Sequence, residues 1–259
     1  MKQIESCEVL SIKEISKDIF DIRVKADQVV RDAKPGQFVT LYTEDPSKLL
    51  PRPMSICGLD KENGILRMVF RISGKGTAGF AALKEGGHIR VMGPHGNGFP
   101  LEAAAGKKAA VIGGGIGIPP MLETAKSLGN AAKVTAVLGY RDELYLNDEF
   151  EKASSAVIIS TEDGSAGTKG NVLDAMKANG YKPDIIYACG PKPMLRALKQ
   201  YAIDENIECW LSMEERMACG IGACLACVCN STEKDEHSNV NNKRVCKDGP
   251  VFNALEIEL

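Results

Sequence analysis

The sequence predicts a protein in three parts: a six-stranded antiparallel β barrel, an α/β domain with a parallel sheet, and a small cysteine-rich subdomain. Short apolar runs separated by turn residues fill the first hundred residues, a pattern typical of a barrel. Strands and helices then alternate, which favours a parallel sheet. Closely spaced cysteines follow. We therefore expect domains at 1–100, 101–212 and 213–259.

The composition is that of a globular protein without a strongly charged face. Hydrophobic residues make up 44% of the 259 residues, and 32 Lys and Arg nearly balance 34 Asp and Glu. This balance gives no field that would recruit nucleic acid or anionic lipid. No run approaches the roughly eighteen apolar residues of a membrane span, and the first residues start no secretory signal. We therefore expect a cytoplasmic protein that binds neither nucleic acid nor membranes.

The first hundred residues are expected to form six strands and one short helix. Turn residues such as those at 34–36 separate the strands. Because no long helix lies between them, the strands favour an antiparallel barrel over βαβ units. The expected strands are 7–12, 19–24, 37–42, 54–58, 64–72 and 88–92, and the expected helix is 77–83.

Two stretches of this barrel have the chemistry of an anion site. In the first, an arginine, a rigid proline and a serine leave a strand end together. In the second, Gly and Thr begin a helix, where backbone N–H groups and a hydroxyl can bind a pyrophosphate. A surface ion pair is the alternative role for the arginine. The candidate residues are Arg52, Pro53, Met54, Ser55, Val69, Phe70, Arg71, Gly76 and Thr77.

Beyond an alanine-rich link at 101–106, the chain predicts an open parallel sheet. Ligands of such sheets lie beyond the carboxyl ends of the strands. Glycines and polar residues stand at these ends, at 113–117, 140–141, 161–164 and 189–191, and they should converge on one edge. The expected strands are 107–112, 133–139, 156–160, 184–188 and 207–211, and the expected helices are 121–128, 147–152, 171–178 and 191–205.

The glycine run after the first of these strands is typical of a nucleotide loop. Glycines let the backbone approach a pyrophosphate, although the G-x-G-x-x-G fingerprint is absent and a packing turn is the alternative. Asp142 and Glu143 follow the next strand and suit a ribose hydroxyl, which favours NAD, while Arg141 suits a 2′-phosphate equally well. The candidate strand-end residues are Gly113, Gly114, Gly115, Gly117, Cys189, Gly190 and Pro191.

Four cysteines near the end of the chain have the spacing of an iron–sulfur site. Four, two and eighteen residues separate Cys219, Cys224, Cys227 and Cys246, and plant-type ferredoxins hold a [2Fe–2S] cluster in such a run. The small residues between them let N–H groups turn toward sulfur. The alternatives are a structural zinc site, which usually has paired C-x₂-C units, and unligated thiols. Most of the other cysteines are expected to be small buried hydrophobes, namely Cys7, Cys57, Cys189, Cys209 and Cys229.

The two barrel stretches together resemble the flavin site of the ferredoxin reductase superfamily. The resemblance implies an FAD whose pyrophosphate contacts Arg52 and Thr77, with Ser55 near the isoalloxazine and residues 69–71 along the flavin. It further implies a nicotinamide dinucleotide on the sheet, with residues 189–191 close to the nicotinamide. Met194 would pack beside them.

The whole chain resembles the electron-transfer subunits of the dihydroorotate dehydrogenase B enzymes, most specifically at 52–55, 74–77, 113–120, 189–191 and 213–220. The resemblance implies FAD, a [2Fe–2S] cluster and a catalytic partner subunit carrying FMN, in a heterotetramer of two of each. That enzyme passes electrons from dihydroorotate to NAD⁺ in pyrimidine (UMP) biosynthesis. A departure is the polar run at 231–243, with its extra thiol Cys229, which puts the fourth ligand in question.

Elimination leads to the same division of labour. A nicotinamide moves electrons in pairs and a [2Fe–2S] cluster moves them singly, so a flavin is needed between them. The histidines, His88, His95 and His237, are expected to be surface or structural residues, so we expect no catalytic residue for an organic substrate on this chain.

Two other functions remain open from the sequence. One is the small subunit of a flavin-based ferredoxin:NAD(P) oxidoreductase or sulfide dehydrogenase, and the other is a redox-sensing or metal-binding module without turnover. Four cysteine ligands favour the dihydroorotate dehydrogenase subunit, because some of the oxidoreductase relatives have an aspartate in the cluster run.

Overall fold

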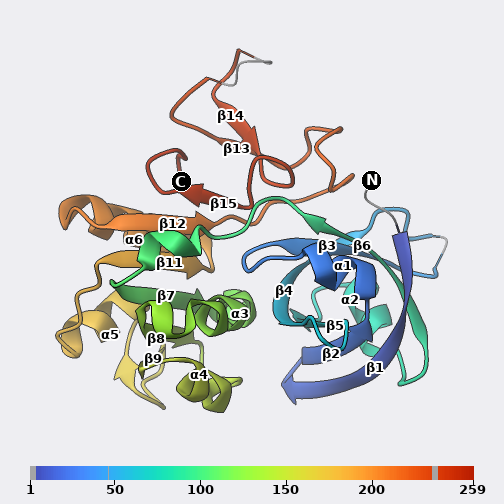
Figure 1. Ribbon diagram of the computed structural model, residues 1–259, viewed down its shortest axis with the longest axis horizontal. Helices are drawn as coiled ribbons and strands as arrows, with labels where there is room; N and C mark the ends of the chain where they lie inside the picture. Colours follow the sequence, from blue (N-terminus) through green and yellow to red (C-terminus); the bar gives the residue numbers. More distant parts are fainter. Residues whose placement is uncertain (1–3, 46, 235–238) are drawn as a thin grey trace.

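The first part of the chain is a closed antiparallel barrel with the strand order β1-β2-β5-β4-β3-β6, and it forms one half of the molecule (Figure 1). The computed structural model describes residues 4–45, 47–234 and 239–259. The predicted six-stranded barrel is confirmed. Its strands are β1 (Ile4–Ser16), β2 (Ile19–Lys25), β3 (Phe38–Tyr42), β4 (Arg52–Asp60), β5 (Ile65–Arg71) and β6 (His88–His95).

The long first strand closes the barrel. Residues 4–8 pair with β6, whereas the part from Val9 to Ser16 pairs with β2, with register shifts that bend the strand between its two partners. The expected short helix is present as α2 (Lys75–Ala81), two residues earlier than predicted, and a second helix, α1 (Asp27–Asp32), was not predicted. Val29 and Val30 of α1 are buried in the barrel core, and this packing explains why so short a helix is stable.

The second part is a seven-stranded sheet with the order β10-β9-β8-β7-β11-β12-β15. All of its neighbours pair in parallel except β12 and β15. Its strands are β7 (Lys108–Gly114), β8 (Lys133–Tyr140), β9 (Ala156–Thr161), β10 (Thr168–Lys169), β11 (Ile185–Cys189), β12 (Glu208–Ser212) and β15 (Val251–Asn253). Its helices are α3 (Ile118–Leu128), α4 (Asn147–Ala153), α5 (Val172–Ala178) and α6 (Lys192–Asp204), with 3₁₀ turns η1 (Leu101–Ala104), η2 (Gly115–Gly117) and η3 (Gly129–Ala131).

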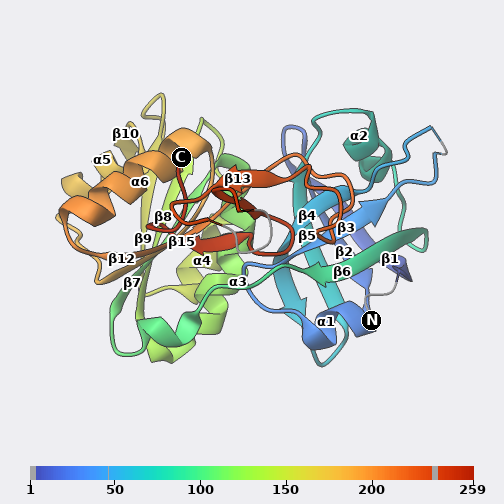
Figure 2. The ribbon, with the colours of Figure 1, turned by 90° about the horizontal axis from the view of Figure 1, so that it is seen from above.

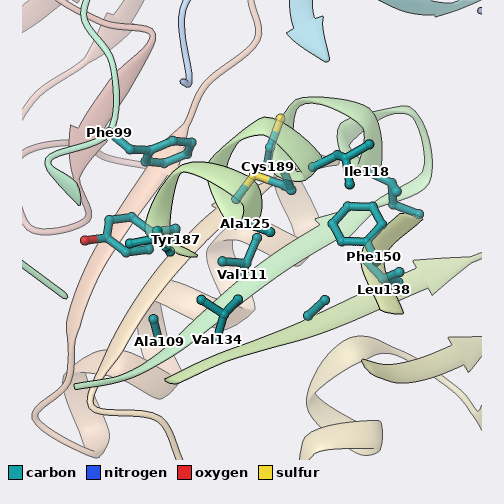
Figure 3. Close-up of a cluster of buried hydrophobic side chains, with 14 of the residues drawn as sticks. Phe99, Ala109, Val111, Ile118, Ala125, Val134, Leu138, Phe150, Tyr187 and Cys189 are labelled. Atoms are coloured by element: carbon teal, nitrogen blue, oxygen red, sulfur yellow. The ribbon is translucent and has the colours of Figure 1, made fainter. Parts of the chain in front are cut away.

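Strand alternation divides the sheet core into two layers. Ala109 and Val111 of β7 face α3 and α4 (Figure 3), whereas Ala110 and Ile112 face α5 and α6. Both faces are covered, as apolar strands of parallel sheets require. None of the helices in the described ranges combines the length and apolar character that crossing a membrane requires.

The third part lies over the junction of barrel and sheet (Figure 2). It contains the hairpin β13 (Val228–Asn230) and β14 (Asn242–Arg244). It also supplies β15, which pairs antiparallel with β12 and gives the sheet an edge that the sequence did not predict. The last barrel strand ends at His95 and the first sheet strand begins at Lys108. The exact domain limits stay a prediction.

Barrel and sheet are joined by buried charge. Arg67 of β5 binds Asp21 of β2 at 2.8 Å and Glu149 of α4 at 2.7 Å. Nearby, the carboxylate of Glu123 on α3 accepts the N–H of Leu59 on β4 at 3.0 Å. These contacts hold helices α3 and α4 of the sheet domain against strands β4 and β5 of the barrel.

Candidate functional site

The predicted flavin residues meet in one cavity of about 390 Å³, here called the barrel cavity. All of them line it except Gly76. Phe38 and Ser73 complete the barrel side, and the sheet and the third part close the other side. The barrel cavity is lined by Phe38, Arg52, Pro53, Met54, Ser55, Val69, Phe70, Arg71, Ser73, Thr77, Ile116, Ser212, Met213, Glu214, Glu215, Met217 and Pro250.

Gly76 places the cation of this cavity. A Cβ at Gly76 would collide with the Arg52 guanidinium, so glycine at this position leaves the guanidinium room to lie against the start of α2. Arg52 also donates to the carbonyl of Leu50. The first N–H groups of a helix have no acceptor within the helix. A guanidinium beside such a helix start suits an anionic diphosphate, so the residues present fit the predicted FAD.

Thr77 has a local role as well. Its hydroxyl accepts the N–H groups of Ser73 at 2.9 Å and Gly74 at 3.2 Å, and it donates to the Gly74 carbonyl at 3.0 Å. The hydroxyl hydrogen is therefore already used in shaping the start of α2. A direct contact of this hydroxyl with a pyrophosphate stays a prediction.

Glu214 is a cavity residue that sequence reasoning missed. It lines the barrel cavity, where the surrounding protein raises the pKa of its carboxyl by partial desolvation although the residue keeps exposed surface. Burial also raises the pKa of the nearby Cys189 thiol, and the charge of Glu214 adds to this rise. Glu214 follows the end of β12, so the rule that ligands gather beyond strand ends would have found it if applied to the last parallel strand.

The predicted nucleotide residues border a second pocket of about 870 Å³, here called the sheet pocket. Only Gly114, Gly115 and Pro191 of that set line it. The side chain of Met194, which also lines it, would lie 2.5 Å from a Cβ at Gly114, so it packs as the resemblance implied.

The remaining strand-end residues lie behind the sheet pocket. A Cβ at Gly113 would lie 2.7 Å from the Cα of Ile118, and one at Gly117 would collide with the Cys189 carbonyl. Gly190 lies against Met194 and the backbone of Gly114. The packing role that was the alternative for this glycine run therefore applies to Gly113 and Gly117. Contact of these residues with a dinucleotide stays a prediction.

Glu143 is engaged in a different contact from the one expected. Its carboxylate accepts the hydroxyl of Ser16 at 2.6 Å and the N–H of Lys17 at 3.3 Å, and the Ser16 hydrogen bond lowers its pKa. The carboxylate thus ties the β1–β2 turn of the barrel to the mouth of the sheet pocket. Arg141 and Asp142 line the same mouth. They remain the candidates for binding a 2′-phosphate and a ribose hydroxyl, respectively.

The four predicted metal ligands lie in two pairs. Cys219 and Cys224 are neighbours that affect each other's charge, and so are Cys227 and Cys246, while all four thiols are free. Within the described ranges, no three His, Cys, Asp or Glu side chains converge where one ion would lie. In a [2Fe–2S] cluster each iron takes two of the four thiolates, so two pairs of thiols fit that group.

Hydrogen bonds to sulfur support the same assignment. Cys219 Sγ accepts the N–H of Ile221 at 3.4 Å and of Ala223 at 3.3 Å, and Cys227 Sγ accepts the N–H of Cys246 at 3.4 Å. Burial raises the pKa of Cys219, but these N–H groups and the Cys224 thiol outweigh it and bring that pKa down to about 6. For Cys246, burial and the contact with Cys227 raise the pKa to about 12.

The segment 219–227, here called the cysteine loop, has the backbone that its glycines allow. Gly220 and Gly222 have φ of +69° and +86°, values that other residues rarely adopt. The loop presents Ile221 and Leu225 to solvent, at 51% and 57% exposure. The other five cysteines are all buried, which confirms the prediction for them. His88 is exposed, His95 is buried, and His237 lies outside the described residues.

Three families match consecutive parts of the chain. One described as an oxidoreductase FAD-binding domain matches residues 6–99, and one described as an oxidoreductase NAD-binding domain matches 111–200. The iron-sulfur cluster binding domain of dihydroorotate dehydrogenase B matches 214–258. These matches agree with the predicted cofactors, FAD, NAD and an iron–sulfur cluster, and with the predicted order of their parts.

Similar proteins extend over the whole chain. Proteins named "Dihydroorotate dehydrogenase B (NAD(+)), electron transfer subunit" are 43% identical in Bacillus caldolyticus, over 98% of both chains, and 43% in Geobacillus sp. (strain WCH70), over 100% of both. A solved structure described as "Insights into flavin-based electron bifurcation via the NADH-dependent reduced ferredoxin-NADP oxidoreductase structure" is 31% identical. It superposes with a TM-score of 0.87 over 97% of this chain and 89% of that one. A ferredoxin NADP+ reductase from Neisseria gonorrhoeae with bound FAD and NADP, 18% identical with a TM-score of 0.67 over 86% and 95% of the chains, shares the fold.

Proposed function

Since the chain belongs to the family of the electron transfer subunits of dihydroorotate dehydrogenase B, we propose that it carries electrons between a catalytic partner subunit and NAD⁺. One observation carries the proposal: the three candidate sites adjoin one another in the order that this transfer needs. Arg71 lines both the sheet pocket and the barrel cavity. Phe38 lines the barrel cavity and belongs to the same core cluster as Cys227 and Cys246.

Each site has a distinct task in this proposal. FAD in the barrel cavity and a [2Fe–2S] cluster on the cysteine loop would supply the exchange between a hydride pair and single electrons. Arg52 and the start of α2 hold the diphosphate, and Ser55 and residues 69–71 line the ring. Gly114, Gly115 and Pro191 border the nicotinamide dinucleotide. Cys219, Cys224, Cys227 and Cys246 bind the cluster, and the chain divides at 1–100, 101–212 and 213–259.

The partner in this proposal is a catalytic subunit that carries FMN and binds dihydroorotate, in a heterotetramer of two of each. Electrons enter or leave through the cysteine loop, whose exposed apolar side chains, Ile221 and Leu225, suit a protein interface. No residue of this chain is assigned to the chemistry of dihydroorotate. The pathway served is pyrimidine biosynthesis.

The test compares the chain alone with the reconstituted complex. Alone, the holoprotein should reduce artificial dyes with NADH. It should leave dihydroorotate unchanged, because dihydroorotate binds to the partner subunit. Addition of an FMN-bearing catalytic subunit should produce dihydroorotate:NAD⁺ activity. An isolated chain that oxidised dihydroorotate would refute the division of labour.

A substitution in the cysteine loop tests the interface. Leu225→Ser should lower dihydroorotate:NAD⁺ activity by about tenfold, since an apolar contact at an interface is worth about 1–2 kcal/mol. NADH-to-dye turnover should stay unchanged. Ile203→Ser, at an exposed apolar position on α6, is the matched control. If the two variants had equal effects, the cysteine loop would not be part of the interface.

The 31% identical structural relative supports one alternative. If the chain ignored the FMN subunit but exchanged electrons between NADH and ferredoxin, it would be the small subunit of a flavin-based ferredoxin:NAD(P) oxidoreductase.

A further inference from the structure

Beneath the cysteine loop the barrel contributes a buried polar pair, His95 and Thr40. His95, the last residue of β6, has no exposed surface, and its Nε2 lies 3.1 Å from Oγ1 of Thr40 on β3. The Thr40 hydroxyl donates to the Met92 carbonyl at 3.4 Å. The two side chains thus share one hydrogen bond, whose donor follows from the tautomer of His95. Neither group acts in the function proposed above.

Thr40 is the barrel residue on which the cysteine loop rests. A Cβ at Gly220 would lie 2.9 Å from Cγ2 of Thr40, and apart from its chain neighbours no other described residue comes within 4 Å of it. The backbone of Gly220, with its left-handed φ, therefore lies directly on the Thr40 methyl group. Just after Gly220, the backbone N–H groups of Ile221 and Ala223 donate to Cys219 Sγ.

The surroundings of His95 connect the other two parts of the site. Its ring packs against Phe38, with ring centroids 5.2 Å apart, and Phe38 lines the barrel cavity. Two residues after His95, Asn97 donates its N–H to the Gly249 carbonyl at 2.6 Å and its side-chain amide to the Val251 carbonyl at 2.9 Å. His95 thus stands between the barrel cavity, the cysteine loop and the segment that follows Cys246.

We propose that His95 is a positioning residue: by bonding to Thr40 it holds the Thr40 methyl under Gly220, and so sets the N–H···S hydrogen bonds of the cysteine loop and the reduction potential of its cluster. Threonine has two γ substituents, and a hydrogen bond to one of them decides which faces the loop. Hydrogen bonds to sulfur are among the terms that set the potential of an iron–sulfur centre. This inference rests on the cluster site proposed above.

Four single variants of the anaerobically purified full chain, and one double variant, test it. His95→Phe keeps a ring against Phe38 and loses the hydrogen bond to Thr40. Thr40→Val loses the hydroxyl and keeps a methyl under Gly220. His95→Gln keeps a hydrogen-bonding amide near the place of Nε2. His88→Gln, at the exposed start of the same strand, is the control. Iron, sulfide and FAD contents are measured first, and EPR-monitored titration then gives the cluster potential relative to the flavin.

His95→Phe and Thr40→Val should bind iron and FAD as the unmodified chain does. In His95→Phe, the equilibrium between reduced flavin and reduced cluster should change by about fivefold, the equivalent of one neutral hydrogen bond. Thr40→Val should leave this equilibrium unchanged, because a methyl then lies under Gly220 whichever γ substituent faces the loop. The double variant should also leave it unchanged, because no hydroxyl remains for His95 to orient. His95→Gln and His88→Gln should keep the original potential and EPR spectrum.

The following outcomes would contradict the role proposed for His95. A cluster potential that stays the same in His95→Phe, or that changes equally in His95→Phe and in the double variant, would overturn the role of His95 and leave the proposed function intact. If His95→Phe failed to fold, Thr40→Ser, which keeps the hydrogen bond and removes the methyl under Gly220, would decide: an unchanged potential would overturn the role of the pair. An unmodified chain without an iron–sulfur cluster would overturn both proposals.

Discussion

At the residue scale, Arg52 is the fixed cation of the barrel cavity, and its position depends on a glycine neighbour. The side chain lies over the start of α2 because Gly76 leaves room for it. In the superfamily flavin site that these residues resemble, this cation would face a diphosphate. A charge-assisted contact of this kind is stronger than a neutral one, so its loss should be measurable.

Arg52→Ala should weaken FAD binding by about 2 kcal/mol, or about thirtyfold, the usual range for a hydrogen bond to a charged group. Fluorescence titration of the deflavinated protein measures this affinity, and the iron content should not change. Arg23→Ala, which removes an exposed arginine from β2, should bind FAD normally. If Arg52→Ala kept its flavin through dilution and gel filtration, Arg52 would have only a surface role.

Residue patterns predicted what lies close together along the chain. The spacing of Cys219, Cys224 and Cys227 and the strand-end stretch 52–55 each lie on one loop or strand, so the sequence itself carries their geometry. The contact of Glu143 with Ser16 joins residues 127 positions apart, and no local pattern records it. His95 escaped for the same reason, since its significance comes from Thr40, which another strand supplies.

At the scale of the element, the cysteine loop is tested by removing one ligand. Cys224 is the exposed member of the run. Cys224→Ser should lose the cluster while FAD stays bound, because a hydroxyl is a poor ligand for iron and the barrel cavity takes no residue from this loop. The unmodified chain should contain about two iron and two sulfide ions.

The chain supplies a matched control in its extra thiol. Cys229 is buried on β13, two residues beyond Cys227, whereas it is Cys246 whose N–H donates to Cys227 Sγ at 3.4 Å. Cys229→Ser should therefore keep the iron, which would answer the question raised by the long arm before Cys246. Iron loss in Cys229→Ser instead of Cys246→Ser would move the fourth ligand, and stoichiometric zinc in the unmodified protein would refute the cluster.

Most elements were predicted at their centres and less well at their ends. Helix α3 begins at Ile118 instead of residue 121, because Pro119 and Pro120 are accommodated in its first turn. Strand β15 was missed because three residues carry no periodicity, and it exists only through pairing with β12. Both cases depend on how the chain packs in three dimensions, which the sequence alone does not show.

At the scale of the whole molecule, three carboxylates hold the barrel against the sheet domain. Glu143 binds the β1–β2 turn, Glu123 binds the backbone of β4, and Glu149 binds Arg67. All three come from the sheet domain. Electron transfer falls steeply with distance, so a joint that fixes the barrel cavity against the sheet pocket serves the proposed function as well as stability.

Glu149 makes this joint testable through pH. Its hydrogen bond with Arg67 lowers its pKa against the opposing effect of burial, and Lys126 lowers it further. The ionised carboxylate is thus favoured by folding. Its contribution to stability is present above the ordinary carboxyl pKa and is lost as the pH falls through the lowered value.

Glu149→Gln should therefore lower the free energy of unfolding by about 1 kcal/mol at pH 7, a value reduced from that of a buried pair because a third of the Glu149 side chain is exposed. The difference from the unmodified chain should shrink as the pH falls through the lowered pKa, since the carboxyl is then protonated in both the folded and the unfolded state. Urea unfolding at pH 7 and at one acid pH below that pKa measures it. Glu151→Gln, the same change on the solvent side of α4, should have no effect at either pH. A deficit in Glu149→Gln that persisted undiminished at low pH would show that shape, and not charge, joins the two domains at α4.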